Sequence, residues 1–323
     1  MPPFTRHRAL AVLGTVLIAA GTCLAAGCST RSAGNDGGSG STATSHQPQA
    51  GDATGGQDTV AADKAGIPWA PAGSATITPG IQTYTQGAGQ CTANYVFVDG
   101  AGTVYLGQAA HCASSGQADQ TNGCAAASLA TGTSVDFNRD GSPISNGTTI
   151  GTGQLVYSSW LTMQQNGETD KNTCAYNDLA LVRIAAENVG QVNPSLPYWG
   201  GPAGIDTTGL LLGGAVYSYG NSSLRGGFAG LSPQSGQSKP DDSATGGWTH
   251  AVISPTPGIP GDSGSAYLDR TGNALGTLST LGISIPAINN IGDISHELAY
   301  ARAHSGISGL TLVLGTESFT ANR

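Results

Sequence analysis

The chain has 323 residues, and its 20 acidic and 12 basic side chains give a formal net charge of −8. An acidic chain without a basic run is a poor ligand for nucleic acid, so we expect no nucleic-acid partner. Only 10% of the residues are charged, glycine occurs 50 times and aromatic residues are few. This composition argues against a helical bundle and favours an all-β protein with many tight turns.

Residues 1–28 form a predicted signal peptide. Arg6 and Arg8 make a basic start, and an apolar run follows over residues 9–20. The small residues ahead of Cys28 resemble a bacterial lipobox, in which the cysteine thiol is acylated and becomes the new N-terminus. Ordinary cleavage of the signal and an uncleaved anchor are the alternatives. All three place the rest of the chain outside the cytoplasm, and the first anchors it to the outer face of the membrane through Cys28.

Residues 29–66 form a predicted flexible tether. The segment is rich in Gly, Ser, Thr, Ala and Gln and has no aromatic residue, so it cannot bury enough apolar surface to fold. A pro-segment trimmed on secretion is the alternative. Residues 67–323 are the predicted folded domain, and no stretch after residue 30 is long and apolar enough to cross a bilayer.

Short apolar runs separated by turn residues predict antiparallel strands in this domain. The turns 99–102 and 269–273 have the residues of β-hairpins. A helix is predicted over residues 293–304, because apolar residues recur on one face and Gly306 follows as a stop. The domain has the length of two small antiparallel barrels. The predicted strands are 95–98, 103–107, 179–184, 210–219, 249–254, 265–268 and 274–281.

Three short motifs carry candidate catalytic groups. Ser263 lies in Gly-Asp-Ser-Gly, His111 in Ala-Ala-His-Cys, and Asp178 in Asn-Asp-Leu-Ala-Leu. A serine hydroxyl is a poor nucleophile, so it needs a base to take its proton and N–H donors to hold the oxyanion that forms. His111 is the candidate base and Asp178 the carboxylate that orients it. Taken singly, these residues could also be a turn serine, a structural histidine and a capping aspartate.

The three motifs, in the order His, Asp, Ser, resemble those of the chymotrypsin-like serine peptidases, in particular their secreted bacterial branch. The resemblance extends from about Ile77 to Leu314. It implies an all-β fold of two packed antiparallel β-barrels with a short C-terminal helix, and a site in the cleft between the barrels. It also implies an oxyanion hole formed by the backbone N–H groups of Gly261 and Ser263.

The resemblance implies a buried ion pair for Asp262, which shapes the oxyanion turn. In animal members the partner is a new N-terminus made by cleavage, but this chain lacks the Ile-Val-Gly-Gly start that such activation needs. The bacterial branch uses an internal arginine, and Arg225 is the candidate here. This arrangement predicts an enzyme that is active without cleavage of its catalytic domain.

Substrate contacts are assigned by the same resemblance. The pocket segment 254–260 holds no acidic residue, which favours an uncharged, small-to-medium side chain at the cleavage site. Leu281 replaces a usual glycine, so either the pocket is narrowed or the register is shifted by one. His250 is either a ligand for an acidic side chain, as in glutamate-preferring relatives, or a strand residue without a ligand role. The predicted substrate-binding residues are Pro257, Ser279, Thr280 and Leu281.

Four cysteines remain after the signal segment, an even number in an exported domain, with three possible pairings. In the resembled family the cysteine after the catalytic histidine bonds to one on the preceding strand. Carried over, this gives Cys91–Cys112 and leaves Cys124–Cys174. We expect no metal site, because no Cys-x-x-Cys pair occurs and the calcium-like run 136–141 lacks the glutamate that such a loop requires.

The sequence therefore predicts a serine endopeptidase outside the cytoplasm that hydrolyses protein or peptide substrates through an acyl-enzyme, as a monomer without a cofactor. It would contact a membrane only through its lipidated N-terminus. The alternative is a catalytically degenerate, surface-anchored binding module of the same fold. An esterase that uses the same triad is a second alternative, although the Gly-x-Ser-x-Gly elbow of α/β-hydrolases is absent around Ser263.

Overall fold

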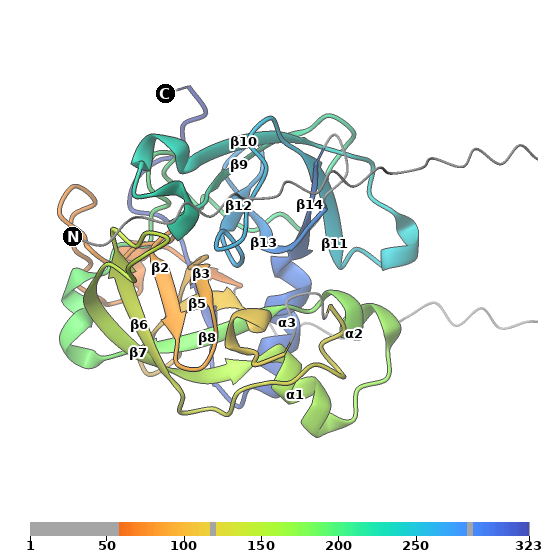
Figure 1. The fold of residues 1–323 in the computed structure, drawn as a ribbon, viewed down its shortest axis with the longest axis horizontal. Helices are drawn as coiled ribbons and strands as arrows, with labels where there is room; N and C mark the ends of the chain where they lie inside the picture. Colours follow the sequence, from red (N-terminus) through yellow and green to blue (C-terminus); the bar gives the residue numbers. More distant parts are fainter. Residues whose placement is uncertain (1–57, 117–120, 283–286, 323) are drawn as a thin grey trace, which may run out of the picture. The chain divides into compact units, whose positions relative to one another are not determined.

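The computed structural model describes residues 58–116, 121–282 and 287–322, all within one compact unit, Ala53–Arg323. The predicted signal peptide, Cys28 and most of the predicted tether lie outside the described residues. Short strands dominate the described chain (Figure 1). In chain order they are β1 (Thr59–Val60), β2 (Gln82–Thr85), β3 (Gln90–Thr92), β4 (Val96–Val98), β5 (Val104–Ala109), β6 (Ser134–Arg139), β7 (Thr148–Ser158), β8 (Leu179–Ile184), β9 (Ala215–Tyr219), β10 (Pro233–Ser238), β11 (Thr249–Ile253), β12 (Ala266–Leu268), β13 (Ala274–Leu281), β14 (Ile288–Asp293) and β15 (Thr311–Val313), with helices α1 (Ser159–Asn166), α2 (Lys171–Tyr176) and α3 (Ile294–His304).

The first barrel closes through one bent strand. Its sheet has the order β1-β15-β4-β5-β8-β7-β6-β2-β3, and β3 runs almost directly into β4. The N–H of Ala93 donates to Ile81 O at 2.9 Å and extends the β2–β3 pairing, whereas the N–H of Asn94 donates to Gly107 O at 2.8 Å and extends the β4–β5 pairing. Residues 90–98 therefore pair with β2 through β3 and with β5 through β4, which closes the part of the sheet from β4 to β3 into a six-stranded barrel.

The second barrel is closed by its own ladder, in the order β10-β11-β14-β13-β12-β9. All its pairings are antiparallel, and its interior is filled by fully buried aliphatic side chains, among them Val216, Val252, Leu275 and Ile291. The prediction of two packed antiparallel β-barrels, the chymotrypsin-like architecture, is confirmed.

The predicted C-terminal helix is α3. It begins after Asp293, whose side chain accepts a hydrogen bond from the N–H of His296 at 2.8 Å, as an N-cap should. Ile294, Leu298 and Ala301 are buried as predicted, and the helix packs against β8 of the first barrel and β13 of the second. The chain then returns to the first sheet, where β15 pairs with β4.

Two predicted boundaries were wrong. Residues 58–66 belong to the folded domain and not to the predicted tether: Thr59–Val60 form β1, because this β-branched pair adds in parallel to the open edge of β15. The strand predicted over 210–219 is only β9, because the chain turns at Gly213, whose φ of 75° ends the extended conformation.

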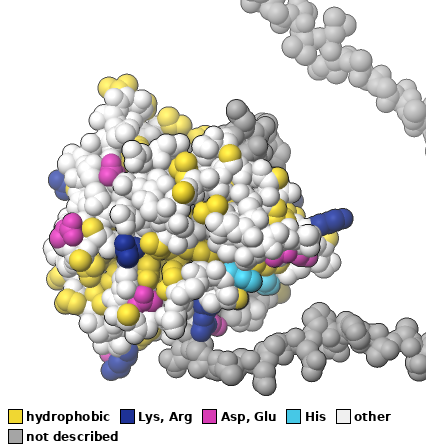
Figure 2. All heavy atoms as spheres, turned by 90° about the horizontal axis from the view of Figure 1, so that it is seen from below, with side chains coloured by type: hydrophobic (Ala, Val, Ile, Leu, Met, Phe, Trp, Pro, Cys, Tyr) yellow, Lys and Arg dark blue, Asp and Glu magenta, His cyan; other side chains and the backbone are white. Residues whose placement is uncertain are grey.

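The surface carries few charges. On the face drawn in Figure 2, Lys, Arg, Asp and Glu side chains are few and scattered, as the low charged fraction leads one to expect. Within the described residues, no helix has the length and hydrophobicity needed to cross a bilayer.

Candidate active site

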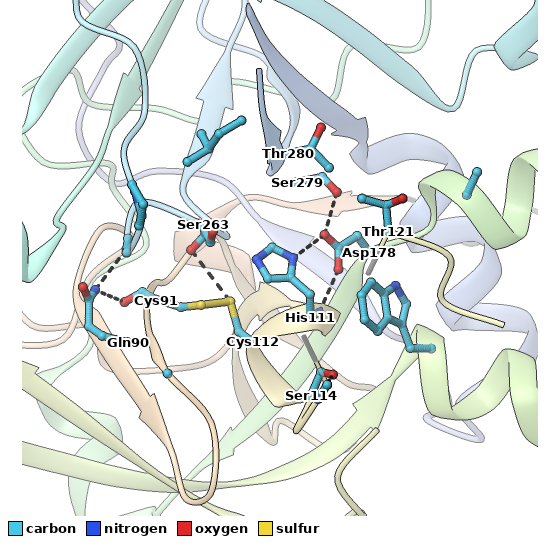
Figure 3. A pocket seen from close by; sticks show the side chains of 17 residues that line it. Gln90, Cys91, His111, Cys112, Ser114, Thr121, Asp178, Ser263, Ser279 and Thr280 are labelled. Carbon is cyan, nitrogen blue, oxygen red and sulfur yellow. Dashed lines mark hydrogen bonds and ion pairs between the residues drawn. A yellow bond between two sulfur atoms is a disulfide. The ribbon is translucent and has the colours of Figure 1, made fainter. Parts of the chain in front are cut away.

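A cavity of ≈ 430 Å³ lies where the two barrels meet (Figure 3). Its lining includes His111 and Asp178 from the first barrel and Ser263 from the second. The structure therefore brings the three sequence-predicted groups together at one site, although they lie far apart in the chain.

Two hydrogen bonds join His111 and Asp178. His111 lies in the single turn that follows β5, and its N–H donates to Asp178 Oδ1 at 2.9 Å while its ring Nδ1 lies 2.7 Å from Asp178 Oδ2. Because an ionised carboxylate only accepts, Nδ1 carries the proton and Nε2 is left as the basic nitrogen. Figure 3 shows this second nitrogen on the side of the ring that faces Ser263.

The electrostatics around His111 favour a strong base. Burial disfavours the imidazolium, but the charge of Asp178 and its hydrogen bond to the ring outweigh burial, so the pKa of His111 is raised above the ordinary 6.5. Asp178 is itself held from two sides. The Ser279 hydroxyl donates to its Oδ2 at 2.7 Å, and the Asp178 N–H donates to Glu297 Oε1 at 3.0 Å.

Ser263 stands on a sharp turn that only glycines permit. Gly261 and Gly264 have φ values of 96° and 87°, in the left-handed region. A Cβ atom on Gly264 would lie 2.6 Å from Thr92 O. Thr92 N also donates to Ser263 O at 2.8 Å, so the turn is fastened to the first barrel. Among the described residues, no hydrogen bond joins the Ser263 hydroxyl to His111.

Two backbone N–H groups beside the serine face away from the protein's own acceptors. The carbonyls that precede Gly261 and Ser263 are hydrogen-bonded internally, to the Ser222 hydroxyl at 2.5 Å and to the Ser265 N–H at 3.0 Å. In a trans peptide the N–H points opposite to the carbonyl, so the N–H groups of Gly261 and Ser263 point away from Ser222 and Ser265. In the described part of the chain, neither amide has a hydrogen-bond acceptor. This is the arrangement that an oxyanion hole requires.

Asp262 lies beneath this turn as a fully buried carboxylate. It forms an ion pair with Arg225, the partner expected from the sequence, through Nη2 and through Nε at 3.4 Å. It also accepts hydrogen bonds from the N–H groups of Ser222 and Ile259, at 2.9 and 3.0 Å, and from Gln234 Nε2 at 3.1 Å. The buried charge is therefore neutralised and fully hydrogen-bonded.

Gln90 is a site residue that the sequence analysis missed. Its Nε2 donates to Gly261 O at 3.0 Å, and its Oε1 accepts from the N–H of Ser223 at 2.9 Å. The Thr92 hydroxyl donates to the same Gly261 carbonyl at 2.8 Å. The first barrel thus fixes the oxyanion turn of the second, a long-range contact for which the local sequence of β3 holds no signal.

The predicted substrate-binding residues are only partly brought together. Ser279, Thr280 and Leu281 line the cavity, whereas the pocket segment contributes Pro260 to its lining instead of Pro257. Leu281 packs against the core of the second barrel, and a Cβ atom on Gly258 would lie 3.0 Å from its Cδ2. Leu281 therefore lies directly against the pocket segment.

His250 is occupied by two carboxylates. Its ring nitrogens each lie 2.9 Å from an acidic oxygen, one from Asp241 and one from Asp293, and its side chain is buried. With both nitrogens bonded inside the protein, His250 is a structural residue of the strand. Its interaction with these carboxylates outweighs burial, which by itself disfavours the charged ring, and raises the pKa of His250.

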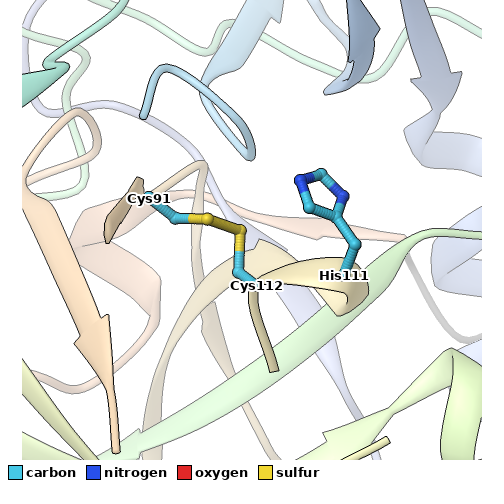
Figure 4. A group of neighbouring side chains, drawn as sticks. All are labelled: Cys91, His111 and Cys112. Carbon is cyan, nitrogen blue, oxygen red and sulfur yellow. A yellow bond between two sulfur atoms is a disulfide. The ribbon is translucent and has the colours of Figure 1, made fainter. Parts of the chain in front are cut away.

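Both predicted disulfides are confirmed. Cys91–Cys112 fixes the His111 turn to β3, and Cys124–Cys174 fastens the following loop to α2. His111, Cys91 and Cys112 have ligand atoms within 4.8 Å of one another (Figure 4). Both sulfurs are consumed in the disulfide, so this group offers no thiolate to a metal.

The two antiparallel barrels, with histidine and aspartate on one and serine on the other, define the chymotrypsin-like class of fold. No model of a known protein family and no curated protein matches this chain. Solved bacterial serine proteases are similar to it at low identity. Thermobifida fusca Protease A is 17% identical, covering 74% of this chain and 99% of its own, with a TM-score of 0.45. Nocardiopsis Protease is 17% identical, covering 73% and 98%, with a TM-score of 0.42.

A third similar structure is that of a glutamic acid specific serine protease, which uses a histidine triad in substrate binding. It is 17% identical, covers 73% of this chain and 100% of its own, and has a TM-score of 0.40. Because these TM-scores are below 0.5, the function of this chain has to be inferred from its own residues.

Proposed function

We propose that the chain is a serine endopeptidase that cleaves protein or peptide substrates through an acyl-enzyme. His111 Nε2 takes the proton of the Ser263 hydroxyl as this attacks the scissile carbonyl, and the N–H groups of Gly261 and Ser263 bind the resulting oxyanion. His111 then protonates the leaving amine. A water deprotonated by His111 attacks the ester, and the acid product leaves with Ser263 restored. Asp178 keeps the imidazole in the required tautomer throughout.

One observation carries this proposal: the His111–Asp178 pair, the Ser263 turn and the two unbonded N–H groups meet at one cavity. A pure binding module has no physical need for this combination. The ion pair between Arg225 and Asp262 supports activity without cleavage, because the oxyanion turn is held by an internal partner. The position of Leu281 against the pocket segment supports a small-to-medium side chain at the cleavage site, and the lack of an acidic residue in segment 254–260 supports an uncharged one.

We further propose that the enzyme acts as a monomer outside the cytoplasm, anchored through lipidated Cys28. The two disulfides support an oxidising compartment. Metabolic labelling with a clickable fatty acid, compared between the wild type and Cys28→Ser, tests the anchor. Equal labelling of both chains would refute it.

Labelling with a fluorophosphonate probe tests the catalytic proposal, because the probe reacts only with an activated serine. The wild-type chain should be labelled, and Ser263→Ala and His111→Ala should not. Ser265→Ala is the matched control, since this neighbouring serine lies outside the cavity lining and should leave labelling unchanged. A folded, disulfide-bonded wild type that is not labelled would refute the proposal and favour the binding module. For a labelled wild type, the relative turnover of peptide and ester substrates separates a peptidase from an esterase.

A further inference from the structure

Glu297 is a fully buried acidic residue next to the site. It lies on α3, its side chain is fully excluded from solvent, and its Oε1 accepts the backbone N–H of Asp178 at 3.0 Å. The carboxyl fits only because a neighbour has no side chain: a Cβ atom on Gly292 would lie 2.4 Å from this same oxygen. A glycine at the end of β14 thus leaves room for an acidic group directly beneath Asp178.

The charges around Glu297 oppose its ionisation. No Lys, Arg or His of the described residues forms an ion pair with it, and its Oε2 is a buried atom without a partner. The two histidines nearby, His250 and His296, are bonded to Asp293 instead. Burial, followed by the charge of Asp178, raises the pKa of Glu297 well above the ordinary 4.5. The titratable groups that face it are Asp178 just before β8, Asp293 on β14, Tyr95 before β4 and Tyr157 on β7.

We propose that Glu297 is a positioning residue for the catalytic base: as a neutral carboxylic acid it holds the backbone of Asp178, and through Asp178 the imidazole of His111. This inference rests on the proposed function. Neutrality matters, because a carboxylate at this place would put a second negative charge beside Asp178 without a cation to balance it. A neutral acid supplies the acceptor for the Asp178 N–H at no such cost.

Two substitutions separate the hydrogen bond from the charge. Glu297→Gln keeps the acceptor and the neutral form, so kcat should stay within about twofold of the wild type. Glu297→Leu removes the acceptor and leaves the Asp178 N–H buried and unpaired, so kcat should fall about 10- to 100-fold with KM within about twofold. Glu187→Gln makes the same carboxyl-to-amide change on an exposed residue far along the chain and serves as the control.

A stability measurement tests the protonation state without turnover. A carboxyl whose pKa is higher in the folded than in the unfolded state loses folding stability as the pH rises between the two values. The urea midpoint of Glu297→Gln should therefore rise relative to the wild type between about pH 5 and pH 8, whereas that of Glu187→Gln should follow the wild type. A midpoint for Glu297→Gln that falls below the wild type at pH 8 would show a charged, stabilising Glu297 and overturn the inference.

Probe labelling of the wild type keeps the two proposals apart. A wild type that is not labelled refutes the proposed function, whatever the variants do. A labelled wild type with unchanged kcat in Glu297→Leu overturns the positioning role. If Glu297→Leu does not fold, the test of the inference is the pH dependence of the Glu297→Gln urea midpoint. The downfield proton resonance of His111 Nδ1 is a second test, and it should be the same in Glu297→Gln as in the wild type.

Discussion

Replacing Arg225 with alanine would leave Asp262 as a buried carboxylate without its cation. The Asp262 side chain has 0% exposure and the Arg225 side chain only 11%, so solvent cannot replace the lost partner. Removing one member of a buried ion pair typically costs about 3–5 kcal/mol. The three neutral donors from Ser222, Ile259 and Gln234 remain, and they offset part of this loss. We therefore expect Arg225→Ala to lower the free energy of unfolding by about 3 kcal/mol.

The same variant should lose activity, because Asp262 lies between the two residues that present the oxyanion donors. We expect kcat to fall about 100-fold, the size of effect seen when one such donor is lost. Urea unfolding monitored by fluorescence gives the stability, and peptide hydrolysis gives kcat. In the double variant Arg225→Ala with Asp262→Asn, the buried charge is gone, so the loss should be smaller than the sum of the single losses.

Arg183→Ala is the matched control for the loss of an arginine. Arg183 is exposed on β8, and among the described residues its guanidinium is bonded only to the Gln154 side chain, at 2.8 Å, so its removal should change stability by less than about 0.5 kcal/mol. The reasoning would be refuted if Arg225→Ala unfolded at the wild-type urea midpoint and hydrolysed peptide at the wild-type rate.

Three further predictions concern the base His111, the hydrogen bond from Ser279 to Asp178, and the second disulfide. His111 must be neutral to act as the base, and Asp178 raises the pKa of His111 above 6.5, so kcat/KM should fall as the pH drops through that pKa. If kcat/KM on the acid side of the profile is half-maximal at a pH below 6.5, the assignment of His111 as the base is contradicted. Ser279→Ala removes a 2.7 Å hydrogen bond to Asp178 and should lower kcat about tenfold at constant KM, so an unchanged kcat would argue against it. Removing the Cys124–Cys174 bridge by a double serine substitution should cost about 2–4 kcal/mol of stability, measured by urea unfolding, and an equal midpoint would contradict this.

The strands with a regular apolar pattern were predictable, and the polar ones were not. β8 lies fully within the first barrel, and its sequence Leu-Ala-Leu-Val-Arg-Ile is a nearly continuous apolar run. β7 is the longest strand and was missed, because glycines interrupt its pattern. A Cβ atom on Gly153 would lie 2.6 Å from Arg183 O, so the close packing of neighbouring strands requires a residue that weakens the local signal. β10 is not predicted because its sequence, Pro-Gln-Ser-Gly-Gln-Ser, has no large apolar side chain from which an alternating pattern could be recognised.

Some residues of the candidate site were also predictable from the sequence, and others were not. The three motifs around His111, Asp178 and Ser263 are local, so the sequence alone predicts the groups that the structure brings together. The supporting residues are not local. Gln90 meets Gly261 across the junction of the barrels. Glu297 has the helical spacing of the buried face of α3, with Ile294 and Ala301, but its acidic side chain would by itself be assigned to solvent. Such contacts depend on tertiary packing, which no neighbouring residue encodes.

The order of elements along the chain also sets the order in which the site is assembled. A ribosome releases the N-terminal end first, so β5 and β8, with His111 and Asp178, emerge well before the Ser263 turn. The helix α3, which accepts the Asp178 N–H, and β15, which returns to β4, come later still. A growing polypeptide that stops short of α3 therefore lacks part of the support for the proposed base, so the proposed activity would begin only after α3 has been synthesised and has packed against Asp178.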